Sequence, residues 1–112
     1  MKDIASMTDL DISISFALFT AAKRMNIKQT DISDRFRMSE SAVSRMLNFK
    51  QHVYYSFVHL FCREFNFPIE DFYKIVEFCL KEEIPKKLKT QKIKQQKLSQ
   101  ELDSLVEKLP NL

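Results

Sequence analysis

The chain has 112 residues, a length that fits one domain or one domain with an appendage. Hydrophobic residues make up 45% of it and include ten Phe, which is enough apolar surface for a compact core and argues against global disorder. Glycine is absent and the net charge is only +3; because tight hairpins usually need Gly or Asn at positive φ, the composition disfavours an all-β fold and favours an all-α one.

The first predicted helix covers residues 9–25 and is apolar on two faces. Thr8 followed by Asp11 resembles a capping box at its start, and Asn26 can take the left-handed conformation that ends a helix. One face carries Leu10, Ile14, Leu18, Ala21, Ala22 and Met25, and the other carries Ile12, Phe16 and Phe19. A helix with two apolar faces is either deeply buried or contacts a partner.

Two short helices are predicted next, over residues 29–37 and 40–48, with a link of about three residues between them. Ser39 is a suitable N-cap for the second of them. Their inward side chains are expected to be Ile32 and Phe36 in the first and Val43, Met46 and Leu47 in the second. Such a pair of helices inside a small helical domain suggests a helix-turn-helix.

A fourth helix is predicted over residues 55–65, and a fifth begins at Pro68, a residue that suits the start of a helix. Their buried faces are expected to consist of Val58, Phe61, Cys62 and Phe65 in the fourth and Phe72, Ile75, Val76 and Cys79 in the fifth. The sequence thus predicts a five-helix domain over residues 1–85.

The segment 86–112 follows Pro85, which interrupts the pattern, and reads as an amphipathic, coiled-coil-like helix. A heptad-like stripe runs along it through Leu88, Gln91, Gln95, Leu98, Leu102, Leu105 and Leu109. A lone helix gains nothing from an apolar stripe that faces water, so the stripe should pair with a second copy of the chain or with the folded domain. We expect self-association, as a dimer or tetramer, and assign this segment as an oligomerisation helix.

Basic residues are concentrated in two zones of the chain. Residues 23–50 carry seven Lys/Arg against three Asp/Glu, and residues 86–112 also carry seven against three. Residues 1–85 as a whole are close to neutral, with 11 basic and 12 acidic residues. Both zones are candidates for contact with an anionic partner, although a lysine run is most often a solvated helix face.

Residues 27–73 resemble the Cro/repressor-type helix-turn-helix family, also described as XRE-like or lambda-repressor-like. The resemblance lies in an ordered set of short matches that needs no gaps. Gln29 stands at the start of the second helix, and "MSESAVSR" (38–45) and "NFK" (48–50) match the family's turn and third helix. The closing motif is matched by "FPIEDF" (67–72). The family fold is five-helical and all-α, as the periodicity alone predicts.

The resemblance implies that the third helix enters the major groove of double-stranded DNA. The implied base-contacting residues are Glu40, Ser41, Ser44 and Arg45. The implied phosphate-contacting residues are Gln29, Thr30, Ser39, Asn48 and Lys50, with Arg37 close enough to join them. Arg45 can bond bidentately to guanine and Glu40 can accept from the amino group of cytosine. Alternatives stay open for two of these residues: a helix N-terminal charge for Glu40, and a phosphate contact or pairing with a carboxylate for Arg45.

This chain departs from the family pattern at several helix ends. Family glycines fall at Arg37 and Phe49, and Asn replaces them at Asn26 and Asn66. Asn tolerates left-handed backbone, whereas Arg and Phe adopt it at a cost. Lys28 stands where a Ser or Thr cap is usual, so the second helix is expected to begin differently.

The function expected from these features is that of a sequence-specific DNA-binding transcriptional regulator of phage, plasmid or bacterial type. It would bind a palindromic operator as a dimer or higher oligomer, acting as a repressor or activator, under control of its abundance, its operator affinity or a partner protein. The alternative is a protein-interaction module, antitoxin- or adaptor-like, that keeps the fold without specific DNA binding. Salt-dependent binding to duplex DNA discriminates the two.

Enzymatic activity is not expected, because the sequence offers no nucleophile-base arrangement, metal-ligand cluster or glycine-rich phosphate loop. Cys62 and Cys79 are isolated within apolar runs and are expected to be buried free thiols. No cofactor and no metal is therefore predicted. Neither a signal-peptide pattern nor an apolar run of membrane-spanning length is visible, so we expect a cytoplasmic, nucleoid-associated protein without membrane contact.

Overall fold

The computed structural model describes residues 7–90, and within them every regular element is a helix. The helices are α1 (Asp9–Arg24), α2 (Gln29–Phe36), α3 (Glu40–Leu47), α4 (Tyr55–Glu64), α5 (Ile69–Lys81) and α6 (Ile84–Thr90). The all-α prediction is confirmed, and the first four helices each end one residue before the predicted end. Among residues 7–90, no helix has the length and hydropathy needed to cross a membrane.

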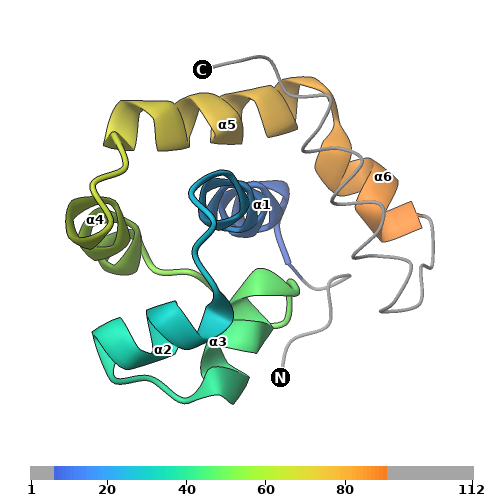
Figure 1. The fold of residues 1–112 in the computed structure, drawn as a ribbon. Coiled ribbons are helices and arrows are strands. Elements are labelled where there is room, and N and C mark those ends of the chain that lie inside the picture. The colour runs from blue at the N-terminus through green and yellow to red at the C-terminus, as the bar shows by residue number, and fades with distance from the viewer. Residues whose placement is uncertain (1–6, 91–112) are drawn as a thin grey trace.

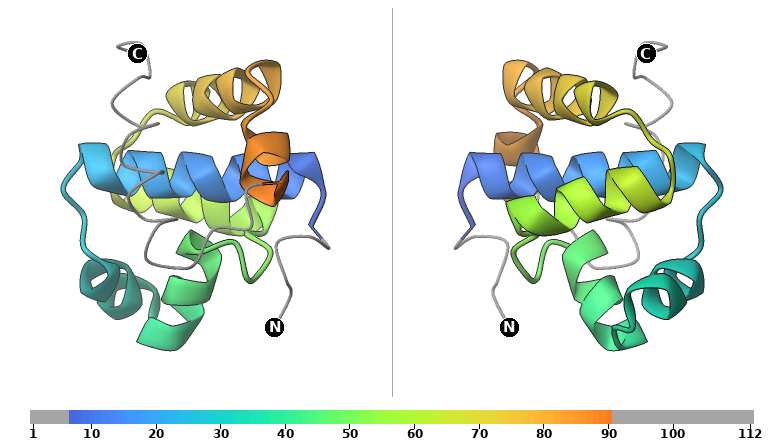
Figure 2. Two further views of the ribbon diagram at one scale, coloured as in Figure 1. Left: turned by 90° about the vertical axis from the view of Figure 1, so that its right-hand side faces the viewer. Right: turned by 90° about the vertical axis from the view of Figure 1, so that its left-hand side faces the viewer.

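Helix α1 is the centre of the folded body. It contacts α3, α5 and α6, and α5 lies on the side of α1 opposite to α2 and α3 (Figure 1) (Figure 2). The consecutive residues Ser15, Phe16, Ala17 and Leu18 are all fully buried. Because four consecutive residues point in every direction around a helix with 3.6 residues per turn, α1 is covered on all sides. The two apolar faces predicted for this helix are thus explained by burial over its middle, whereas the predicted face residues Leu10 and Met25 at its ends are exposed.

Two of the three buried hydroxyl groups within α1 have a partner inside the helix. Ser13 Oγ donates to the carbonyl of Asp9 at 2.8 Å, and Thr20 Oγ1 donates to the carbonyl of Phe16 at 2.8 Å. Each of these two hydroxyls uses a carbonyl of the preceding turn, so its desolvation is compensated within the helix. Ser15 Oγ is also buried and has no hydrogen-bond partner within the described residues.

Side-chain hydrogen bonds cap the N-termini of the first three helices. Thr8 Oγ1 accepts from the Asp11 N–H at 3.1 Å while an Asp11 carboxylate oxygen accepts from the Thr8 N–H at 3.3 Å, which confirms the capping box before α1. Ser39 Oγ accepts from the Ala42 N–H at 3.1 Å and caps α3. At α2 the Asp31 carboxylate accepts from the Lys28 N–H at 2.8 Å, so the cap comes from within the helix.

A residue with left-handed backbone follows each of the first five helices. Its φ is 55° at Asn26, 54° at Arg37, 63° at Phe49, 56° at Asn66 and 55° at Glu83. The first four are the positions that the sequence pattern singled out as requiring glycine-like geometry. A residue with a Cβ adopts this conformation at a cost of roughly 1–2 kcal/mol, least for Asn. The ring of Phe49 is fully buried, and this burial offsets the cost at that position.

The hydrophobic core joins all six helices. Of the predicted core residues, Val43, Val58, Phe61 and Phe72 are fully buried. Phe36 and Phe65 lie at the edge of the core and are partly buried, with their ring centroids 6.0 Å apart. Phe49, Met7 and Val53, which lie outside the helices, also belong to the core, and the periodicity did not predict them.

Helix α6 runs across the boundary predicted after Pro85. It begins at Ile84 and passes through Pro85, which a first helical turn accommodates, and it packs on α1 and α5. Leu88, the first residue of the predicted self-association stripe, is buried in the core of the chain. Lys89 Nζ lies 3.3 Å from an Asp9 carboxylate oxygen and ties α6 to α1. The predicted oligomerisation residues Gln91, Gln95, Leu98, Leu102, Leu105 and Leu109 lie outside the described residues.

Opposite effects are expected when Arg37 and Phe49, two of the three left-handed residues other than Asn, are replaced by glycine. Arg37 is exposed, so Arg37→Gly should raise the free energy of unfolding by about 1 kcal/mol through relief of the backbone cost. Phe49→Gly relieves a similar cost but removes a buried ring, so it should lower the free energy of unfolding by about 2–4 kcal/mol. Denaturant melts of both variants measure the difference, and equal effects of the two would contradict this account.

Candidate nucleic-acid interface

Helices α2 and α3 form a pair with a three-residue link. The Arg37 N–H closes α2 by donating to the Ser33 carbonyl, and the Met38 N–H donates to the same carbonyl at 3.0 Å. Ser33 Oγ donates in turn to the Met38 carbonyl at 2.5 Å. Ser39 then caps α3, so all three residues of the link have a defined structural role. The link is tight because left-handed backbone at Arg37 reverses the chain immediately after α2.

Helix α3 is divided into a buried face and an outer face. Val43 and Met46 point into the core and are at most 2% exposed. On the outer face Glu40 and Ser41 are exposed, and Arg45 is partly exposed. The pair α2–α3 forms one end of the body, away from α5 (Figure 2). Polar side chains from the N-terminal half of α3 are therefore presented to solvent on a rigid support.

The predicted contact residues at the starts of the two helices lie together. Gln29 Nε2 donates to the Glu40 carbonyl at 3.1 Å, which joins the N-terminus of α2 to that of α3. Thr30 beside Gln29, and Ser39 and Arg37 in the link, are exposed. These polar residues gather at the N-termini of the two helices, the ends of a helix that favour an anion.

The predicted contact residues at the end of α3 are joined by hydrogen bonds. Asn48 Nδ2 donates to the carbonyl of Ser44 at 2.8 Å and lies 3.2 Å from Ser44 Oγ. The Lys50 N–H donates to the Arg45 carbonyl at 2.9 Å. Arg45 Nε donates to Gln51 Oε1 at 3.0 Å. Ser44, Asn48 and Lys50 are partly buried, so this end of the surface is more fixed than the end at Glu40.

The loop between α3 and α4 is anchored to α1. Phe49 and Val53 insert into the core from the loop, and His52 Nδ1 lies 3.0 Å from an Asp11 carboxylate oxygen. Partial burial alone would raise the pKa of Asp11, but hydrogen bonds from Thr8 and the charge and hydrogen bond of His52 outweigh it and lower that pKa below its ordinary value of 3.8. Gln51 and His52 were not predicted from the sequence, because their partners are identifiable only in the folded chain.

The basic character of the interface comes from residues at its edges and its centre. Arg37 lies on the link, Arg45 on α3 and Lys50 just after α3. Glu40 is the one acidic residue of α3. Arg35 is directed elsewhere, since its Nη1 lies 3.2 Å from a Glu64 carboxylate oxygen on α4. The surface is thus modestly cationic, with one acid near its centre.

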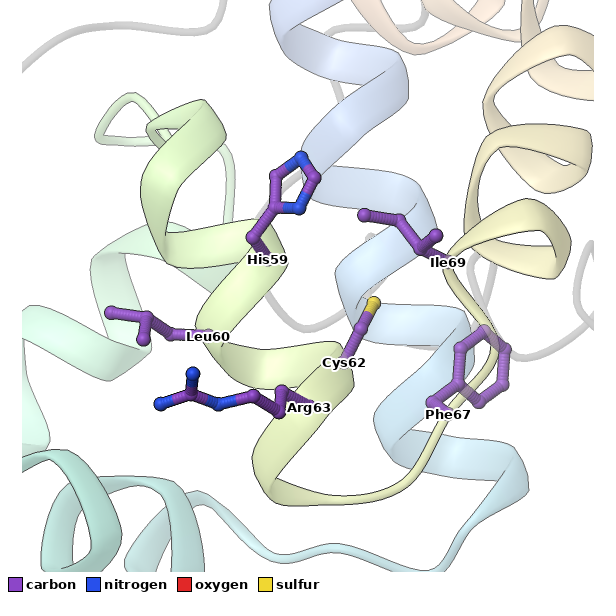
Figure 3. Close-up of a pocket in the computed structure, with 6 residues that line it drawn as sticks. All are labelled: His59, Leu60, Cys62, Arg63, Phe67 and Ile69. Carbon is purple, nitrogen blue, oxygen red and sulfur yellow. The ribbon is translucent and has the colours of Figure 1, made fainter.

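A separate pocket of about 380 Å³ lies between α4 and the start of α5 (Figure 3). It is lined by His59, Leu60, Cys62, Arg63, Phe67 and Ile69. Burial raises the pKa of the Cys62 thiol to about 11, so the thiol is protonated at neutral pH and is a poor nucleophile. Cys62 and Cys79 are both buried and free, as predicted. In residues 7–90, no three His, Cys, Asp or Glu side chains gather where they could hold a metal ion.

Comparisons of the chain with models of known protein families, with curated proteins and with solved structures find no match.

Asp11 provides a pH-dependent test of the anchor between α1 and the α3–α4 loop. Because folding lowers its pKa, its charge contributes stability above about pH 5 that is lost as the pH falls through the native pKa, below 3.8. Asp11→Asn keeps a capping oxygen but removes the charge, and should lower the free energy of unfolding at pH 7 by about 1 kcal/mol. The difference from the wild type should shrink as the pH falls through the native pKa and Asp11 becomes protonated in the folded chain. Asp34→Asn, at an exposed acid of α2, should change stability by less than about 0.5 kcal/mol at either pH.

Proposed function

We propose that this chain is a sequence-specific DNA-binding transcriptional regulator, in which α2 and α3 act as a helix-turn-helix of the Cro/repressor type. The observation that carries the proposal is the division of α3, which buries Val43 and Met46 while it presents Glu40, Ser41 and Arg45 to solvent. A helix held in this way behind a three-residue link has the dimensions to enter a major groove with its N-terminal residues foremost.

Left-handed backbone at the four predicted positions supports the lambda-repressor-like arrangement. The family pattern has glycine where such geometry is needed, and this chain keeps the geometry at Arg37 and Phe49 although their side chains oppose it. Because this chain keeps the left-handed geometry despite its backbone cost, we infer that the helices around α3 tolerate little change in their spacing.

The proposed roles follow from the chemistry of each side chain. Arg45 would donate to O6 and N7 of a guanine, and Glu40 would accept from the amino group of a cytosine. Ser41 and Ser44 lie on the same outer part of α3 and would contact base edges between them. Phosphate contacts are assigned to Gln29, Thr30, Arg37, Ser39, Asn48 and Lys50. Such contacts fix the register of the protein on the duplex without reading its sequence.

The test of this function is selection of duplex DNA from a random pool, followed by titration of the selected duplex at several salt concentrations. A regulator of this kind should enrich a short half-site, and its affinity should fall steeply as salt is raised because bound counterions are released. If no sequence is enriched and no salt-dependent binding occurs, the chain is an interaction module of another kind.

Two variants separate base reading from phosphate contact. Arg45→Ala should weaken binding of the selected site by roughly 1–3 kcal/mol and relax the preference at one base position. Lys50→Ala should weaken selected and random duplexes alike and lower the salt slope by about one. Equal losses on selected and random DNA for both variants would show that Arg45 does not read a base.

The proposed operator is palindromic, and we assign pairing of two chains to the leucine-rich residues 91–109. Leu88 belongs to the core, so the stripe left for pairing is Leu98, Leu102, Leu105 and Leu109, with Gln91 and Gln95 as polar layers that set the register. Two linked copies would bind two half-sites, and the second contact would form at a high effective concentration.

Removal of residues 91–112 tests this assignment while it retains α6 and the buried Leu88. The truncated chain should sediment at a lower mass and bind a two-half-site duplex roughly tenfold or more weakly, because the second contact is no longer intramolecular. Binding to a single half-site should change far less. Identical masses for the full and truncated chains across micromolar concentrations would place the self-association elsewhere.

A further inference from the structure

The guanidinium of Arg45 is held on one edge by a residue outside α3. Its Nε–H donates to Gln51 Oε1 at 3.0 Å. A guanidinium offers two edges with paired N–H groups, the side edge that includes Nε and the end edge formed by the two Nη groups. The bond to Gln51 occupies the side edge, so the end edge is the one presented for bidentate bonding to the O6 and N7 of a guanine.

Gln51 is itself held in place by the residues on both sides of it. Phe49 is fully buried, and His52 lies 3.0 Å from Asp11 on α1 through its Nδ1. The Lys50 N–H donates to the carbonyl of Arg45 at 2.9 Å, which sets the backbone of the loop against the end of α3. The acceptor for Arg45 therefore belongs to a loop that is fixed to the central helix.

We propose that Gln51 is a positioning residue that determines base preference through Arg45. Fixing a long, rotamer-rich side chain in the free protein reduces the entropy lost when that side chain binds, and it also restricts the geometry of the bonds it can form. This inference rests on the proposed function. It adds that the preference at the Arg45 position depends on a residue that does not contact the base.

The test compares Gln51→Leu with Gln51→Glu in the full chain. Gln51→Leu keeps a side chain of similar size but removes the oxygen that accepts from Arg45. Gln51→Glu keeps an accepting oxygen and adds a negative charge. Thermal unfolding of both variants checks that they fold. Two readouts follow, the base preference from pool selection and the hydrogen exchange of the Arg45 Nε–H measured by NMR without DNA.

The expected result is that Gln51→Leu reduces the preference at the Arg45 base position by roughly tenfold, with affinity for random duplex unchanged. Exchange of the Arg45 Nε–H should be faster in this variant. Gln51→Glu should retain the preference while binding all duplexes more weakly, because its charge repels phosphate. In an Arg45→Ala background, Gln51→Leu should have no further effect on preference.

Several results would overturn the inference. One is a Gln51→Leu variant that folds and keeps the wild-type preference. Another is a change of preference at a base position that Arg45→Ala does not affect, which would make Gln51 a base reader in its own right. Unchanged exchange of the Arg45 Nε–H would also overturn it. If the wild-type chain selects no DNA, the proposed function fails and this inference fails with it, whereas the other three results leave the proposed function intact.

Discussion

Burial of α1 on every side is the constraint on which the rest of the structure depends. A helix with apolar residues all round can be stable in water only if other helices cover it, and α3, α5 and α6 contact it directly. Polar groups also connect it to its surroundings, since Asp11 near its start pairs with His52 and Asp9 pairs with Lys89. The α2–α3 pair is attached to α1 through α3 and forms an outer layer of the body. This arrangement leaves one face of α3 accessible to solvent.

The loop between α3 and α4 contributes both to the stability of the fold and to the proposed function. Phe49 and Val53 fill the core beneath α3, while Gln51 between them reaches Arg45 on the outer face. Residues two positions apart along this short irregular segment thus have different roles, in the core or at the outer face of α3. The cost of left-handed backbone at Phe49 is offset by burial of its ring, and the resulting bend directs the loop back along α3.

The helices could be predicted from the sequence because their apolar spacing and caps are local properties. Thr8 with Asp11 and Ser39 marked two helix starts correctly, and the ends of the first four helices were predicted to within one residue. Leu88 shows the limit of such reasoning, because periodicity tells which residues share a face but not what that face meets. The stripe after Pro85 fits a core as well as it fits a second chain.

The candidate site was predictable only in part. The exposure of Glu40 and Ser41 follows from the phase of α3, which the buried Val43 and Met46 define. The bond from Arg45 to Gln51 depends on the path of an irregular loop, and the pairing of His52 with Asp11 joins residues far apart in the chain. Neither leaves a pattern in the sequence. The DNA-binding function and the self-association of residues 91–109 remain predictions.

The packing of α6 and α5 on α1 has a consequence for biosynthesis. The core is completed by Ile75, Ile84 and Leu88, which leave the ribosome long after Phe16. Until α5 and α6 have emerged, a nascent chain carries a central helix that only part of its partners can cover, and domains generally fold as units. The fold can therefore be completed only after residue 90 and the further length of chain held in the exit tunnel have been translated.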